Sequence, residues 1–209
     1  PNNLAMWTSH KPINEQTSPS CPLCKVPYAN LHHILSHCPV LSSIKVYHLR
    51  HNGICAVAKQ FLQRVGWSVL FEEQNISDQF VGCSIRSLTE HTKPDLLLSN
   101  SITGKGTKLI ILDVVVTYES GQALASARDK KLDAYSILAS QLRTKGHHTT
   151  IVPIVVGSRG TIPAWWASEA TNLMLSAAQA ENWAIKSSAI AIAGSHKVFE
   201  MYQMFERKT

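Results

Sequence analysis

The sequence LIILDVVV, at residues 109–116, decides the expected fold. It is an aliphatic run rich in β-branched residues, broken only by one aspartate, which is typical of a strand buried on both faces of a sheet. The apolar stretch KPDLLL, at residues 93–98, predicts a second strand. A polar segment at 99–106 contains Gly104 and Gly106, and it predicts a turn that lets the two strands pair side by side.

The segments around this pair extend it into an α/β fold. A helix expected at 123–142 leads to a short apolar stretch at 151–156, and such a crossover predicts a parallel strand. Other segments add strands and cover the faces of the sheet, so the predicted fold class is α/β with a mixed central sheet flanked by helices. They are a helix at 41–65 ended by Gly66, strands at 67–72 and 80–88, a helix at 164–181 opened by Pro163, and a helix at 183–207 with a kink expected at Gly194.

Composition places the chain among folded domains with an anionic partner. It has 209 residues, of which 44% are hydrophobic and only 16% charged, so wholesale disorder is excluded. The net charge is +6, and it is unevenly distributed: residues 61–120 carry a small acidic excess between two basic flanks. This layout suits carboxylates that hold a metal beside surfaces for a polyanion, although ordinary solvated surface explains it as well.

Two further features concern the context of the chain. No apolar run reaches the roughly 18 residues of a membrane-spanning helix, so no membrane partner is expected. The sequence begins at Pro1 rather than at a methionine, so we expect an internal piece of a longer protein.

Cysteine and histidine residues gather in one short segment. Cys21 and Cys24 form a C-x2-C pair, and His33 and Cys38 form an H-x4-C pair. Zinc takes four tetrahedral sulfur and nitrogen ligands, and two such pairs let a short loop wrap one ion. The spacing therefore predicts a structural zinc knuckle at residues 21–40.

The same spacing leaves alternatives open. His32 and His37 are also compatible ligands, and a disulfide framework would use the same cysteines. No secretory signal is visible, which argues against disulfides. Cys55 and Cys83 lie in apolar surroundings and are expected to be buried as small hydrophobic residues.

Two carboxylates and a lysine predict a catalytic metal site. Asp95 lies at the start of one predicted strand and Asp113 lies inside the next, where a lone carboxylate is costly unless a cation binds it. Mg²⁺ suits one or two carboxylates that share a site with a phosphate substrate. Lys131 and Tyr135 are four residues apart on the predicted helix and share a face. The structural alternatives are an ion pair for Asp113, a turn cap at Asp95 and a solvated Lys131.

The ordered set of these motifs resembles a known family. CPLC, HILSHCP, LRHN, KPDLLL, LDVVVTYE, KKLDAY and IVVGSRGT, within residues 21–161, are similar to the restriction-like endonuclease region of site-specific non-LTR retrotransposon polyproteins. In that family the region follows the reverse transcriptase and carries a CCHC zinc knuckle and a PD-(D/E)xK-type nuclease core. The resemblance implies a restriction-endonuclease-like core here.

The resemblance also implies an activity. It is a Mg²⁺-dependent endonuclease that nicks target DNA, and the freed 3′-hydroxyl primes reverse transcription of the element's RNA. Asp95 and Asp113 match the acidic positions of the motif, and Val114 matches the position whose backbone carbonyl often joins the metal. The usual lysine two residues after the acid is absent, because Val115 stands there.

The resemblance assigns the remaining roles as follows. Lys131 and Tyr135 match the lysine that this family supplies from the next helix in a K-x3-Y setting, with Lys130 as a rival. The LRHN element places Arg50, His51 and Asn52 near the DNA or the active site. The expected nucleic-acid contacts are Arg50, His51, Asn52, Lys93 and Lys130.

The expected organisation is a linker or arm at 1–20, the knuckle at 21–40, the nuclease core at 41–160 and a helical extension at 161–209. The expected partners are double-stranded target DNA, the element RNA through the full-length protein, and the reverse transcriptase of the same polyprotein, with a nuclear location. The first alternative is an inactive zinc-knuckle module that binds nucleic acid. Two others are a related restriction, repair or junction-resolving nuclease, and an interaction domain with Trp165 and Trp166 as a contact patch.

Overall fold

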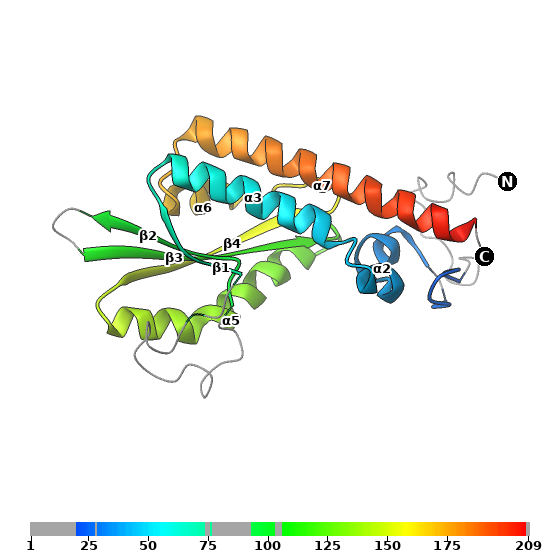
Figure 1. Cartoon of the computed structure of the whole chain (residues 1–209), viewed down its shortest axis with the longest axis horizontal. Helices are drawn as coiled ribbons and strands as arrows, with labels where there is room; N and C mark the ends of the chain where they lie inside the picture. Colours follow the sequence, from blue (N-terminus) through cyan, green and yellow to red (C-terminus); the bar gives the residue numbers. More distant parts are fainter. Residues whose placement is uncertain (1–19, 28, 74–75, 77–92, 103–105, 208–209) are drawn as a thin grey trace.

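The computed structural model describes residues 20–27, 29–73, 76, 93–102 and 106–207 (Figure 1). Ten elements follow one another along this part of the chain. They are η2 (His33–His37), α2 (Pro39–Ser43), α3 (His48–Arg64), β1 (Ser68–Glu72), β2 (Leu96–Ile102), β3 (Gly106–Thr117), α5 (Ala123–Thr144), β4 (His148–Gly157), α6 (Trp166–Asn172) and α7 (Ala177–Glu206). The predicted strand at 80–88, Cys83 and residues 1–19 of the predicted arm at 1–20 lie outside the described residues.

The strands form a mixed sheet in the order β1-β2-β3-β4. β2 is antiparallel to both β1 and β3, and β3 pairs in parallel with β4 after the crossover through α5. β3 therefore has a hydrogen-bonded neighbour on each side, which satisfies its backbone groups. Its side chains are apolar on both faces, apart from Asp113, because both faces of the sheet are covered. The predicted mixed sheet flanked by helices is confirmed.

Helices cover both faces of the sheet, and β3 contributes side chains to each. Helices α3, α6 and α7 lie on one face and α5 lies on the other (Figure 1). Ile110, Leu112 and Val114 belong to the core under the three helices, whereas Leu109 and Ile111 belong to the core under α5. Since side chains alternate along a strand, Asp113 points to the face that α5 covers.

Three helix boundaries differ from the sequence-based prediction. The helix expected at 41–65 is split into α2 and α3, because Lys45 adopts a left-handed conformation with φ 58°. The helix expected at 164–181 ends at Asn172, and Met174 has φ 62°. Ser176 then begins α7 with a capping box, and α7 continues through Gly194.

The predicted turn at 99–106 is shorter than expected. β2 and β3 remain paired as far as Ile102 and Gly106, so most of this polar segment is strand. Polar residues such as Ser99 and Asn100 are tolerated here because they lie near the end of the hairpin and are only partly buried.

Arg50 joins three parts of the chain. Its side chain is 2% exposed, and the guanidinium donates to the Leu35 carbonyl and, at 2.8 Å, to Ser195 Oγ. Gly194 makes this approach possible, since a Cβ there would lie 2.5 Å from the Arg50 Cβ. The contact fixes α3 against α7 and against the segment that carries η2.

Among the described helices, none combines the length and the apolar character that crossing a membrane requires.

Candidate functional site

A cavity of about 590 Å³ lies where α3 begins, beside the ends of β2 and β3 and beside α5. Its lining brings together most of the residues that the sequence singles out, although they come from four separate elements or their flanks. They are Arg50, His51, Asn52, Lys93, Asp95, Asp113, Val114, Lys131 and Tyr135.

Asp113 is the buried carboxylate of this cavity, with 4% of its surface exposed. Lys131 Nζ lies 2.6 Å from Asp113 Oδ2, and the Tyr135 hydroxyl donates to Oδ1 at 2.8 Å. The i, i+4 spacing on α5 presents both groups to one carboxylate. Burial raises the pKa of Asp113 and the charge of Asp95 raises it further, while Lys131 and Tyr135 act in the opposite direction.

Asp95 lies one residue before β2 and faces the same cavity. Its Oδ2 accepts a hydrogen bond from the Val114 backbone N–H at 2.6 Å and lies 3.1 Å from His51 Nε2. Burial raises the pKa of Asp95, but the bonds from His51 and Val114 outweigh it and hold the pKa below its usual value. The bond to Asp95, followed by the contact with Cys55, raises the pKa of His51 to about 11, so His51 is an imidazolium beside a carboxylate.

The structure separates the two candidate lysines. Lys131 contacts Asp113, whereas Lys130 is exposed and does not line the cavity. Lys93 is also exposed at the cavity rim, and its carbonyl accepts a hydrogen bond from Tyr135. Arg50 lines the cavity, and its guanidinium donates hydrogen bonds to the Leu35 carbonyl and to Ser195 Oγ inside the protein.

Sequence reasoning missed one part of the site. Cys55 is partly buried and packs against the hydrophobic core, in line with its predicted apolar surroundings, but its Sγ also lies 3.7 Å from His51 Nδ1. His51 and Cys55 are four residues apart on α3, which is the one sequence signal that predicts a shared face. Their contact with Asp95, 44 residues after His51, depends on the tertiary fold.

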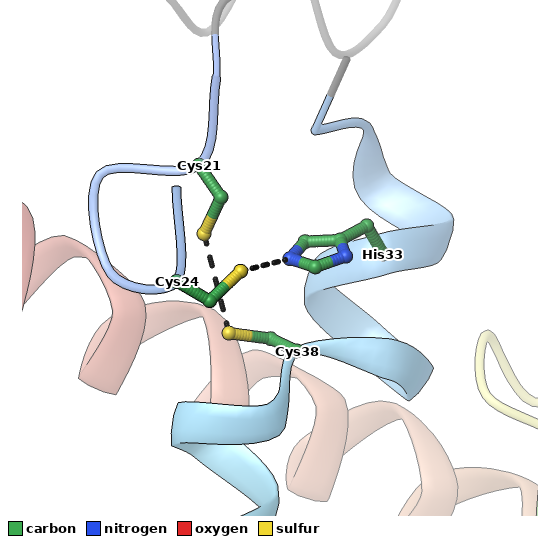
Figure 2. A group of neighbouring side chains, drawn as sticks. All are labelled: Cys21, Cys24, His33 and Cys38. Carbon is green, nitrogen blue, oxygen red and sulfur yellow. Dashed lines mark hydrogen bonds between the residues drawn. The ribbon is translucent and has the colours of Figure 1, made fainter. Parts of the chain in front are cut away.

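The four predicted zinc ligands converge on one point (Figure 2). Cys21, Cys24, His33 and Cys38 each offer a ligand atom, and these atoms lie within 4.8 Å of one another. Cys21 Sγ is 4.0 Å from Cys38 Sγ, and Cys24 Sγ is 3.3 Å from His33 Nε2. A tetrahedral zinc ion holds sulfur and nitrogen ligands about 3.6–3.8 Å apart. The cluster therefore fits zinc, and the sulfur separation is far beyond the roughly 2 Å of a disulfide.

His32 and His37 lie outside this cluster. Their Nε2 atoms are 2.8 Å apart, and the His32 ring stacks on Tyr118 at 4.8 Å between centroids. Of the two adjacent histidines, the structure thus directs His33 toward the cysteines.

The cavity also has the donor chemistry for a hard divalent cation. Asp95 and Asp113 supply carboxylate oxygens, which Mg²⁺ prefers. Burial and then the charge of Asp95 raise the pKa of Asp113, and a bound cation would relieve the repulsion between the two carboxylates. When bound, Mg²⁺ would supply charge stabilisation at a phosphate.

Fold and clusters together define a mixed α/β protein with an N-terminal Cys/His cluster that can bind zinc. No family model matches the chain. The chain is 26% identical over 186 residues to the Retrovirus-related Pol polyprotein from type-1 retrotransposable element R2 of Popillia japonica. The match covers 86% of this chain and 34% of that polyprotein, so the chain spans about a third of the length of its curated relative. The chain is thus similar to part of a retrotransposon polyprotein.

Proposed function

We propose that this chain is a Mg²⁺-dependent DNA endonuclease domain with a restriction-endonuclease-like, PD-(D/E)xK-type core. The observation that carries the proposal is the convergence of Asp95, Asp113 and Lys131 on one cavity. Two carboxylates on paired strands, with Asp95 just before β2 and Asp113 within β3, and a lysine from the following helix are a set of groups that supports metal-assisted hydrolysis of a phosphodiester. The similarity to a retrotransposon polyprotein supports the same conclusion.

The position of each residue in the cavity defines its proposed role. Asp95 and Asp113 would hold the cation, with the Val114 backbone carbonyl as a further ligand. The Lys131 ammonium has three donors, one of which contacts Asp113, and the others would orient a water or a phosphate oxygen in the cavity. Tyr135 orients Asp113 through its hydrogen bond. Such chemistry depends mainly on positioning and charge stabilisation.

The wider role follows from the same proposal. The domain nicks double-stranded target DNA in the nucleus, and the new 3′-hydroxyl primes reverse transcription of the element RNA by the polymerase of the polyprotein. The Cys/His cluster holds zinc and positions the N-terminal segment against α7, where Cys21, Cys38 and Val198 share one hydrophobic cluster.

A plasmid-nicking assay tests the proposal. The wild-type chain should convert supercoiled plasmid to the open-circular form in Mg²⁺ and stop in EDTA. Asp113→Asn should lower the rate by about 10³-fold or more, because it removes the charge that holds the cation. Asp133→Asn is the matched control, since Asp133 is exposed on α5 and should leave the rate unchanged. Nicking by Asp113→Asn at the wild-type rate would overturn the assignment.

A module that binds nucleic acid without cutting it is the second candidate. The cluster that fits zinc and the net charge of +6 favour it. DNA binding by the wild type in a mobility-shift assay, with no nicking in either Mg²⁺ or Mn²⁺, would establish this function in place of the first.

A further inference from the structure

A second set of metal-ligating side chains lies on the cavity side of α3. His51, Cys55 and Asp95 each offer one ligand atom, and the three atoms lie within 4.8 Å of one another. The knuckle uses none of these residues, and the proposed Mg²⁺ site shares only Asp95 with them.

The distances fit a tetrahedral transition-metal ion. His51 Nε2 is 3.1 Å from Asp95 Oδ2 and 3.9 Å from Cys55 Sγ. A zinc ion with ordinary bond lengths holds nitrogen, oxygen and sulfur ligands about 3.3–3.8 Å apart. The three ligand atoms lie within 4.8 Å of one another, so side-chain movements of about an ångström or less would bring them to bonding distance of one ion.

Neighbouring groups already orient these ligands. Asn52 Oδ1 lies 3.1 Å from His51 Nδ1, so the amide oxygen can accept the Nδ1 proton and leave Nε2 to the metal. The Val114 N–H holds the Asp95 carboxylate in place. His51 and Cys55 are one helical turn apart on α3, which fixes their spacing.

The ligand types select the ion. A thiolate and an imidazole bind Zn²⁺ far better than Mg²⁺, which prefers oxygen ligands. Three protein ligands leave a fourth position open, as in sites that exchange their ion or bind a substrate. The His51 side chain is 29% exposed and that of Asp95 is 14% exposed, so an ion can enter from the cavity.

We propose that His51, Cys55 and Asp95 form a second, exchangeable zinc site, and that zinc bound there inhibits the nuclease. Inhibition rests on the proposed function. Asp95 cannot bind zinc and Mg²⁺ independently, and the positive charge of bound zinc opposes binding of Mg²⁺. The binding itself does not depend on nuclease activity. Zinc replaces the proton on His51 Nε2 and the proton of the Cys55 thiol, and both are released to solvent.

Elemental analysis of the whole chain, dialysed against buffered free zinc, tests the binding. The wild type should hold about two zinc ions per chain and Cys55→Ser about one, because the knuckle keeps its ion. The retained knuckle ion also shows that the variant is folded. If Cys55→Ser does not fold, His51→Gln addresses the same question. A wild type with a single zinc ion, or a second ion that survives both substitutions, would overturn the site.

A zinc titration of the nicking assay in constant Mg²⁺ tests the inhibition. At free zinc ten times the dissociation constant, the wild-type rate should fall about tenfold relative to its zinc-free rate, while zinc should leave the rate of Cys55→Ser unchanged relative to that variant's own zinc-free rate. Equal sensitivity of the two proteins would overturn inhibition through this site. Two zinc ions with no nicking in Mg²⁺ alone would instead refute the nuclease and leave the metal site standing.

Discussion

The Cys/His cluster and the carboxylate cavity gather polar side chains in opposite ways. The cluster takes all four ligands from residues 21–38, and these side chains contact one another at 3.3 Å between Cys24 Sγ and His33 Nε2 and at 4.0 Å between Cys21 Sγ and Cys38 Sγ. The cavity takes its groups from α3, β2, β3 and α5, and it already pairs each carboxylate with a cation: Asp113 with Lys131, and Asp95 with His51. A metal is therefore expected to hold the first region together, whereas the fold itself assembles the second.

Removing zinc should have the largest effect on stability and should distinguish the Cys/His cluster, which depends on a metal, from the cavity, which does not. Binding of a structural zinc ion is linked to folding by about 10 kcal/mol in small domains, so Cys21→Ser should release the knuckle ion and unfold the segment around η2. We expect loss of one zinc ion in elemental analysis and a clear fall in the melting temperature. Asp113→Asn should leave both quantities nearly unchanged. Equal losses in the two variants would show that the regions do not differ in this way.

Arg50→Met tests the contact that joins the two regions. The substitution leaves the Leu35 carbonyl without its buried donor and removes the bond to Ser195, so we expect a loss of about 3 kcal/mol of stability. Urea unfolding measures the change. Arg64→Met is the control, because Arg64 is exposed near the end of the same helix and should change stability by less than about 0.5 kcal/mol. An unchanged free energy of unfolding in Arg50→Met would show that Arg50 does not join the two regions.

The two adjacent lysines test whether the cavity alone carries the chemistry. Lys131→Met should lower the nicking rate about 100-fold, or about 2.7 kcal/mol, because Lys131 is the ammonium next to Asp113. Lys130→Met removes the same charge from an exposed position and should change the rate by less than about threefold. Plasmid nicking at saturating Mg²⁺ compares them. A larger loss of nicking rate in Lys130→Met than in Lys131→Met would show that Lys130 is the lysine that acts in the cavity.

The comparison also explains what the sequence could predict. The strand at 109–116 is predicted from its contiguous apolar run and the crossover from the helix that follows it. The spacing of the Cys/His residues predicts a metal-binding cluster but leaves His32 and His37 open as ligands. The breaks at Lys45 and Met174 carry no glycine signal, so their left-handed conformations were not predictable. The His51–Asp95–Cys55 contacts depend on how α3 packs against β2 and β3, which no local pattern encodes.

Tyr135→Phe should have the smallest effect and gives the finest test of the cavity. Burial, followed by the charge of Asp113, raises the pKa of Tyr135, so its hydroxyl stays protonated and donates to Asp113 Oδ1. Losing one such hydrogen bond costs about 1.4 kcal/mol, so nicking should fall about tenfold, with a higher Mg²⁺ requirement because Asp113 is less well oriented. Ser136→Ala, at the exposed neighbouring position, should leave the Mg²⁺ titration unchanged. Identical Mg²⁺ titrations for Tyr135→Phe and wild type would mean that Lys131 orients Asp113 without the tyrosine.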